Sequence, residues 1–303
     1  MLGLTVLARV VTPDRKIPYI CKKNITMKRI LTFLAAVMLL LQGAQAQQRD
    51  TLRILAIGNS FSEDSVEQYL WELFQAADIP VIIGNLYIGG CTLERHFQNS
   101  ILDKADYAYR KVVDGVKTTT PNATLKQGLA DEPWDYVSFQ QASGVSGEYE
   151  TYEPYFQGLR AYVRRRVPAT AVFMWHQTWA YSADATHREF PRYDRNQQKM
   201  YLAIMDASRK AAQSVPVLIP SGTAIQNART SSMGDVFNRD GFHLEYTYGR
   251  YTAACTWFET ISGISVEGNS YFPESISAEV AAICQAAAHA ACQRPYQVTP
   301  IKK

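Results

Sequence analysis

The chain has 303 residues, of which 47% are hydrophobic and 19% are charged, a balance typical of a globular protein rather than a disordered one. Its formal net charge is +3, but residues 1–46 carry seven Lys and Arg against one Asp, and without them the net charge becomes −3. A domain without a basic surplus is not expected to bind nucleic acid through its charge.

Residues 27–46 have the pattern of a secretory signal peptide. Met27-Lys28-Arg29 is a positive start, residues 30–41 are apolar, and Ala44-Gln45-Ala46 is a cleavage site of small residues. The apolar run is too short to span a bilayer, so no membrane insertion is expected after cleavage. The pattern predicts that residues 1–46, a dispensable extension followed by the signal peptide, are removed.

This processing has consequences for domain organisation and location. One domain is expected over residues 47–303, in the periplasm or outside the cell. N-terminal sequencing of the exported protein should begin at or near Gln47, and a cytosolic protein that begins at Met1 would contradict this prediction.

Apolar runs then alternate with helical patterns, which predicts a parallel sheet with helices on both faces. The spacing of apolar residues expected for a helix is clearest over 66–77. The fold class expected is α/β, a three-layer α/β/α sandwich around a parallel five-stranded sheet. The predicted strands are Leu52–Gly58, Val81–Tyr87, Tyr136–Phe139, Ala171–Trp175 and Val217–Ile219, and the later helices are Tyr155–Arg166, Asn196–Ala212, Tyr246–Ser262 and Ser277–Cys292.

Two segments between these elements show no clear periodicity. Asn99 to Pro133 is expected to be irregular, although Ile101–Val116 could form a helix. Asp184 to Arg195 is a polar insertion. Irregular loops of such length in a compact domain are usually functional or mobile.

The residues that point to chemistry stand at both ends of this domain. Gly58-Asn59-Ser60-Phe61 follows the first predicted strand, and Asp240-Gly241-Phe242-His243 comes near the C-terminus. A serine at a strand exit and the start of a helix lies where free N–H groups favour a developing oxyanion. A serine hydroxyl also needs an imidazole base, which in turn needs a carboxylate to fix its tautomer. Ser60 is therefore the candidate nucleophile, His243 the base and Asp240 its partner.

These residues resemble the conserved blocks of the SGNH (GDSL-like) hydrolases. Gly58-Asn59-Ser60-Phe61-Ser62 resembles the first block, Gly89-Gly90-Cys91-Thr92 the second and residues 240–243 the last, while residues 134–141 stand in the place of the third. With Trp-His-Gln-Thr-Trp at 175–179, the chain is most similar to an uncharacterised secreted branch of the Bacteroidetes type. The resemblance covers residues 52–251 and implies a flavodoxin-like SGNH hydrolase fold and ester hydrolysis through an acyl-serine.

The resemblance also implies an oxyanion hole, with two departures from the family pattern. Asn59 replaces the usual Asp, and the third block lacks its usual Asn. The backbone N–H groups of Ser60 and Gly90 are the expected donors. Gln140 or Gln141 would supply the side-chain amide, as a Gln does in related sialate and xylan acetylesterases. Successive strand residues point to opposite faces, so only one of the two is expected to reach the site. The resemblance favours Gln140, because the related acetylesterases place their Gln directly after the strand, and Gln141 is the alternative if the strand is one residue longer.

Four further residues are candidates for binding the substrate. Asn59 adjoins the nucleophile, and Trp175, His176 and Trp179 lie at the end of the fourth predicted strand. Aromatic residues at such a rim often stack on sugar rings, although core packing explains Trp175 equally well. The cysteines that would remain after removal of the signal peptide are interpreted as small buried residues. One of them, Cys91, directly follows the glycine pair.

The expected function is that of a secreted serine esterase acting on O-acyl, chiefly O-acetyl, esters of carbohydrates. The substrate would be a carbohydrate or another small ester, and neither a metal nor an organic cofactor is implied. One alternative is a lipase or thioesterase, which would need an apolar groove or lid. Another is a catalytically weak glycan-binding protein on the same fold, which the altered third block would permit. The sequence leaves the oligomeric state and any disulfide pairing open.

Overall fold

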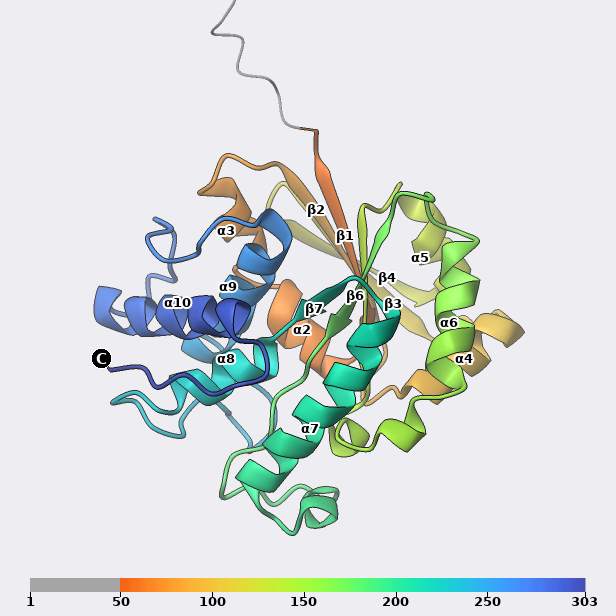
Figure 1. Ribbon diagram of the computed structural model, residues 1–303. Coiled ribbons are helices and arrows are strands. Elements are labelled where there is room, and N and C mark those ends of the chain that lie inside the picture. The colour runs from red at the N-terminus through yellow and green to blue at the C-terminus, as the bar shows by residue number, and fades with distance from the viewer. Residues whose placement is uncertain (1–49, 303) are drawn as a thin grey trace, which may run out of the picture. The chain divides into compact units, whose positions relative to one another are not determined.

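The strands form one mixed seven-stranded sheet in the order β4-β3-β2-β1-β5-β6-β7 in the computed structural model, which describes residues 50–302 (Figure 1). The predicted signal peptide lies outside these residues. The strands are β1 (Leu52–Gly58), β2 (Val81–Tyr87), β3 (Tyr107–Val113), β4 (Val116–Ala123), β5 (Tyr136–Phe139), β6 (Val172–His176) and β7 (Val217–Ile219). The pairs among β2, β1, β5, β6 and β7 are parallel, which is the strand order of flavodoxin-like sheets.

The helices connect and cover these strands. Short 3₁₀ segments occur at η1 (Ser143–Val145), η2 (Tyr149–Thr151), η3 (Phe190–Tyr193) and η4 (Ala212–Ser214). The α-helices are α2 (Ser60–Val66), α3 (Leu70–Gln75), α4 (Leu93–Leu102), α5 (Leu125–Asp131), α6 (Tyr155–Arg164), α7 (Gln197–Ala211), α8 (Ser221–Ala228), α9 (Tyr248–Ser262) and α10 (Ala278–Gln293).

The five parallel strands were predicted, but a purely parallel sheet was wrong. The segment expected to be irregular, or helical over Ile101–Val116, contains the antiparallel hairpin β3–β4 and joins β2 along its edge. Asp114 and Gly115 form its turn with φ of 50° and 74°. An Asp-Gly pair flanked by β-branched residues is a strong hairpin signal, because both turn residues must adopt positive φ.

The two faces of the sheet carry separate hydrophobic clusters, which gives the three expected layers. Along β1, Ile54 and Ala56 pack with α2, α3, α8, α9 and α10, whereas Leu55 and Ile57 pack on the opposite side with α5 and α6. Figure 1 shows these two groups of helices on either side of the strands. Side chains of a strand alternate between faces, so the continuous apolar run of β1 serves both layers.

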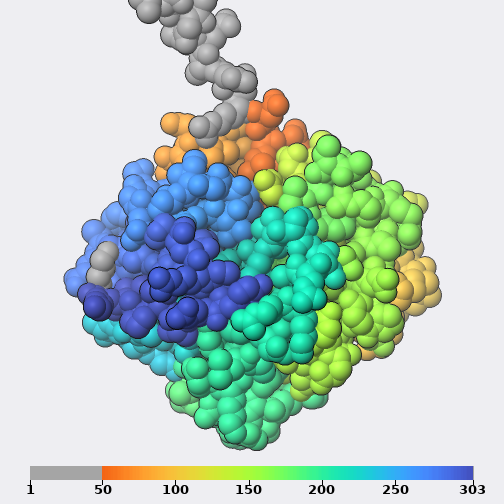
Figure 2. Space-filling view, viewed as in Figure 1, coloured from red at the N-terminus to blue at the C-terminus, as the bar shows by residue number. Residues whose placement is uncertain are grey.

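The C-terminal segment closes one side of the molecule. In Figure 2 the residues that directly follow α10 lie beside those of α7, where the Arg209 guanidinium lies 4.7 Å from the centroid of the Tyr296 ring. The carbonyl of Pro295 accepts a hydrogen bond from Thr223 Oγ1 at 2.6 Å, and the Ile301 N–H donates to Thr230 Oγ1 at 2.9 Å. None of the helices between residues 50 and 302 is long and apolar enough to cross a bilayer.

Candidate active site

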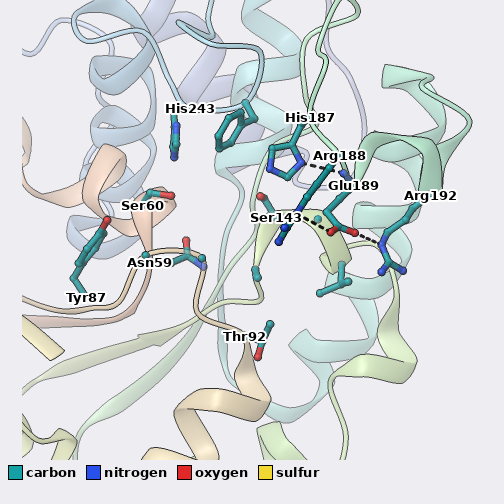
Figure 3. Close-up of a pocket in the computed structure, with 16 residues that line it drawn as sticks. Asn59, Ser60, Tyr87, Thr92, Ser143, His187, Arg188, Glu189, Arg192 and His243 are labelled. Atoms are coloured by element: carbon teal, nitrogen blue, oxygen red, sulfur yellow. Dashed lines mark hydrogen bonds and ion pairs between the residues drawn. The ribbon is translucent and has the colours of Figure 1, made fainter. Parts of the chain in front are cut away.

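A cavity of about 400 Å³ opens where β1, β2 and β5 end. Ligand sites of open parallel sheets lie at this carboxyl edge, where the strand order reverses on either side of β1. Figure 3 shows its side chains. The lining residues are Asn59, Ser60, Tyr87, Gly89, Gly90, Thr92, Ala142, Ser143, Gly144, Val145, His187, Arg188, Glu189, Arg192, Phe242 and His243.

Ser60 is the first residue of α2, directly after the strand. Asn59 caps the helix, because its Oδ1 accepts a hydrogen bond from the Phe61 N–H at 3.0 Å. Gly58 lets the chain turn here, since a Cβ at this position would lie 2.5 Å from Ser62 Oγ and 2.9 Å from Gln140. The helix therefore begins at the residue that carries the hydroxyl into the cavity.

Two residues of the cavity wall have a backbone N–H that no described residue accepts. Within residues 50–302, neither the Ser60 N–H nor the Gly90 N–H makes a hydrogen bond. Gly90 has φ of 63°, in the left-handed region that glycine adopts without strain. The two residues that were predicted to supply backbone donors thus both lie at the cavity wall.

Asp240 and His243 form a bonded pair on the loop that follows α8. Nδ1 of His243 lies 2.6 Å from Oδ2 of Asp240, and Oδ1 accepts from the backbone N–H groups of His243 at 2.8 Å and Phe242 at 3.2 Å. Burial alone would raise the pKa of Asp240, but these hydrogen bonds outweigh it and hold the pKa below its ordinary value. Nε2 of His243 makes no hydrogen bond to the described part of the chain, and the ring points toward Ser60 in Figure 3.

Asp64 ties this loop to the helix of Ser60. Its side chain is buried, and Oδ2 accepts from the Leu244 N–H at 2.8 Å. Oδ1 lies 2.7 Å from a guanidinium nitrogen of Arg250 and 3.1 Å from one of Arg239. One carboxylate on α2 therefore fixes the residue after His243 and two arginines that flank the loop.

The structure corrects the predicted role of the two glutamines. Neither lines the cavity. Gln140 donates through Nε2 to Asn59 Oδ1 at 2.8 Å, while its Oε1 lies 2.8 Å from Nδ1 of His176. Gln141 donates to Thr151, and its Oε1 accepts from the Leu93 and Ala142 N–H groups. Both amides are buried and bonded to protein groups away from the cavity wall, which is not where an oxyanion donor is expected.

The aromatic motif at the end of β6 also lies away from the cavity. Trp175, His176 and Trp179 are at most 1% exposed and none of them lines it. Trp179 stacks on Phe61 with ring centroids 4.1 Å apart and donates through Nε1 to the Phe242 carbonyl at 2.8 Å. Burial lowers the pKa of His176 to about 3, which keeps its ring neutral. These side chains therefore belong to the core beneath the site and form no part of the cavity wall.

The far wall of the cavity comes from a segment whose individual residues the sequence did not identify. His187, Arg188, Glu189 and Arg192 belong to the polar insertion predicted over Asp184 to Arg195. Its length and polarity were the available signal, but nothing in its sequence distinguishes the residues that face inward. Figure 3 shows these side chains opposite Ser60.

The four described cysteines are unpaired, as their interpretation as small buried residues allows. Cys91 lies below the glycine turn, and burial raises the pKa of its thiol to about 12. A thiol with such a pKa is almost wholly protonated at neutral pH and is a poor nucleophile. The hydroxyl of Ser60 is therefore the better candidate for covalent chemistry.

Known proteins resemble this chain to very different degrees. A crystal structure of a DUF4886 family protein from Bacteroides uniformis ATCC 8492 is 54% identical with a TM-score of 0.82, over 83% of this chain and 98% of that one. The acetylxylan esterase Axe2 from Geobacillus stearothermophilus is 12% identical with a TM-score of 0.47, over 71% and 95% of the chains. TesA is 11% identical with a TM-score of 0.46, over 70% and 98%.

The last two similarities are too weak to indicate what this chain does, and no curated protein sequence matches it. The Bacteroides structure confirms the predicted relationship to a Bacteroidetes-type branch. The family described as Domain of unknown function (DUF4886) matches residues 53–291, which include Ser60, Asp240 and His243. The chain therefore belongs to the DUF4886 family.

Proposed function

We propose that the protein is an exported serine esterase that hydrolyses O-acyl, chiefly O-acetyl, esters of carbohydrates. One observation carries this proposal: Ser60 and the Asp240-bound His243 line one cavity, beside N–H groups of Ser60 and Gly90 that have no acceptor within residues 50–302. A hydroxyl, an oriented base and free donors are the parts that acyl transfer needs.

The chemistry follows from these positions. His243 Nε2 takes the proton of Ser60 as Oγ attacks the ester carbonyl, and the resulting oxyanion is held by the free donors. The same proton passes to the oxygen of the departing alcohol as the carbon–oxygen bond breaks. Water then attacks the acyl-serine, again giving a proton to His243, and the carboxylic acid leaves as Ser60 regains its proton. Asp240 stays ionised and stabilises the imidazolium in both halves.

Asn59 replaces the glutamines as the proposed side-chain donor. Its Oδ1 accepts from Phe61 and Gln140, which fixes the orientation of the amide. Nδ2 donates one hydrogen to the Cys91 carbonyl at 3.1 Å, and its second hydrogen has no acceptor among residues 50–302. Gln140 then acts as a positioning residue that holds this amide.

Asn59→Asp tests this assignment with little change of shape. The carboxylate can still accept from Phe61 and Gln140, but it has no hydrogen to donate and adds negative charge beside the oxyanion. We expect kcat to fall about 10²- to 10³-fold with little change in KM. Thermal unfolding of the variant shows whether the fold survives the lost bond to Cys91. A folded Asn59→Asp protein with wild-type kcat would place the donor elsewhere.

The size of the cavity favours a small substrate over a long lipid chain. Ala142, Val145 and Phe242 are the lining residues with purely hydrocarbon side chains, whereas hydroxyl, amide, imidazole and charged groups make up most of the rest. A cavity of about 400 Å³ accommodates an acetyl group and one or two sugar rings rather than a long acyl chain. The resemblance to SGNH hydrolases and the predicted signal peptide support an extracellular glycan as the source of the ester.

Hydrolysis assays separate this function from its alternatives. The protein should release acetate from p-nitrophenyl acetate and from an O-acetylated oligosaccharide, and it should act poorly on p-nitrophenyl palmitate. Preference for the palmitate would favour the lipase or thioesterase alternative. Binding of the oligosaccharide without release of acetate would favour a glycan-binding protein.

A further inference from the structure

We propose that His187 binds the alcohol half of the substrate by donating a hydrogen bond from Nε2. The inference rests on the proposed esterase function and specifies how its cavity distinguishes a sugar ester from a simple one. His187 belongs to the segment between β6 and α7, lines the cavity and lies across it from Ser60 in Figure 3.

The tautomer of His187 is fixed by the backbone. Its Nδ1 accepts a hydrogen bond from the Glu189 N–H at 3.2 Å, which requires Nδ1 to be unprotonated. In the neutral ring the proton is therefore on Nε2. This nitrogen makes no hydrogen bond within residues 50–302, and in Figure 3 it faces the cavity. The ring thus presents a donor of defined direction to whatever occupies the cavity.

Burial lowers the pKa of His187, which favours the neutral ring at neutral pH. The nearby charged groups have opposing effects on this pKa. Glu189 and Asp240 favour the protonated ring, whereas Arg188 and His243 disfavour it. Neutrality matters because it keeps the tautomer with a free acceptor at Nδ1 and a donor at Nε2. A neutral donor suits a hydroxyl or ring oxygen, which carries no charge of its own.

Packing holds the imidazole in place. Its centroid lies 4.5 Å from the Phe242 ring and 4.9 Å from that of Tyr181. Phe242 in turn contacts His243, with centroids 3.9 Å apart. The His187 ring therefore packs on Phe242, the residue next to the proposed base, and this packing restricts its movement.

The place of His187 beside His243 assigns it to one half of the substrate. In ester hydrolysis the base must reach the oxygen of the departing alcohol, whereas the carbonyl oxygen points to the oxyanion donors. Gly90 and Asn59 supply those donors from the ends of β2 and β1, and His187 lies across the cavity from Ser60. A group bound by His187 is therefore on the alcohol side. The substrate class indicated is an ester whose alcohol carries a neighbouring oxygen, as in a partly acetylated sugar.

His187→Phe and His187→Gln give a matched pair of variants. Phe keeps an aromatic ring against Phe242 but removes the donor, whereas Gln can place an amide N–H near the position of Nε2. Thr186→Ala is the control, because Thr186 is an exposed neighbour that does not line the cavity. Two substrates are compared, a mono-O-acetylated methyl glycoside and p-nitrophenyl acetate, whose alcohol has no oxygen beside the ester.

For His187→Phe we expect kcat/KM on the acetylated glycoside to fall about 10- to 100-fold, and to change less than about threefold on p-nitrophenyl acetate. His187→Gln should recover part of the loss, and Thr186→Ala should match the wild type. Equal losses on both substrates would show a structural role for the ring. Unchanged values on both would show that it does not contact the substrate.

A binding measurement keeps this inference separate from the esterase proposal. In a Ser60→Ala background, calorimetric titration with the acetylated glycoside measures affinity without turnover. Adding His187→Phe should raise Kd about 10-fold or more, whether or not the wild-type protein hydrolyses esters. An unchanged Kd would overturn the role of His187. Absence of hydrolysis by the wild type, together with a raised Kd, would overturn the esterase and leave a glycan-binding site.

Discussion

Ser60→Ala is expected to lower ester turnover by about 10⁴- to 10⁶-fold, the largest effect of any single substitution in this protein. The loss is large because the attacking oxygen is removed, while the cavity and the oxyanion donors remain. Turnover of p-nitrophenyl acetate by the wild type and the variant measures it. Little change in thermal stability is expected, because no hydrogen bond of the Ser60 hydroxyl is present within residues 50–302.

A fluorophosphonate probe gives an independent readout of the same residue. Labelling should occur in the wild type and disappear in Ser60→Ala. Ser143→Ala is the matched control, since Ser143 is another serine at the cavity wall, and it should keep full labelling. Labelling that persists in Ser60→Ala would identify another nucleophile.

Asp64→Ala is expected to have the largest effect on stability. Asp64 is buried and accepts from Leu244, Arg239 and Arg250, so its removal leaves charged and polar donors without their partner. Breaking such a buried pair typically costs about 3–5 kcal/mol of the free energy of unfolding. Because Leu244 follows His243, kcat should also fall in whatever fraction of the protein stays folded. Urea denaturation and the activity of the folded fraction measure the two effects.

Two variants make this result specific. Asp64→Asn can still accept from the Leu244 N–H but carries no charge, so its loss of stability should be intermediate. Asp206→Ala removes an exposed carboxylate paired with Lys210 on α7 and should cost less than about 1 kcal/mol. If Asp64→Ala unfolds at the same urea concentration as Asp206→Ala, Asp64 does not anchor the loop.

The sequence predicted the part of the fold that depends on local pattern. The five parallel strands are short apolar runs buried on both faces, and four of the five begin and end at the predicted residues. The fifth, β6, is shifted by one residue. The β3–β4 hairpin was not predicted, because β4 is rich in exposed Lys and Thr and shows no alternation of apolar and polar residues. The pair Asp114-Gly115 was the available signal for its turn.

The residues of the candidate site likewise fall into those that a local motif identifies and those whose role depends on distant partners. Ser60, Asp240 and His243 could be identified because their order and spacing are local motifs that specify chemistry. The functions of Gln140 and Gln141 could not be identified, because they depend on distant partners such as His176 and Thr151. The role of Asp64 could not be predicted either, because its partners are 175 to 186 residues away in the chain. His187 could not be identified within the polar insertion, because its position at the cavity also depends on residues distant in the sequence.

The central claim is that Ser60 carries the acyl group during ester hydrolysis, and the acyl-enzyme itself can be observed. The mature protein is mixed with p-nitrophenyl acetate, quenched in acid during turnover and mapped by peptide mass spectrometry. We expect an acetyl group on the wild-type peptide that contains Ser60. The same peptide from the His243→Ala variant should carry no acetyl group. Acetyl on a different residue, or steady hydrolysis with no acetylated peptide, would contradict the proposed mechanism.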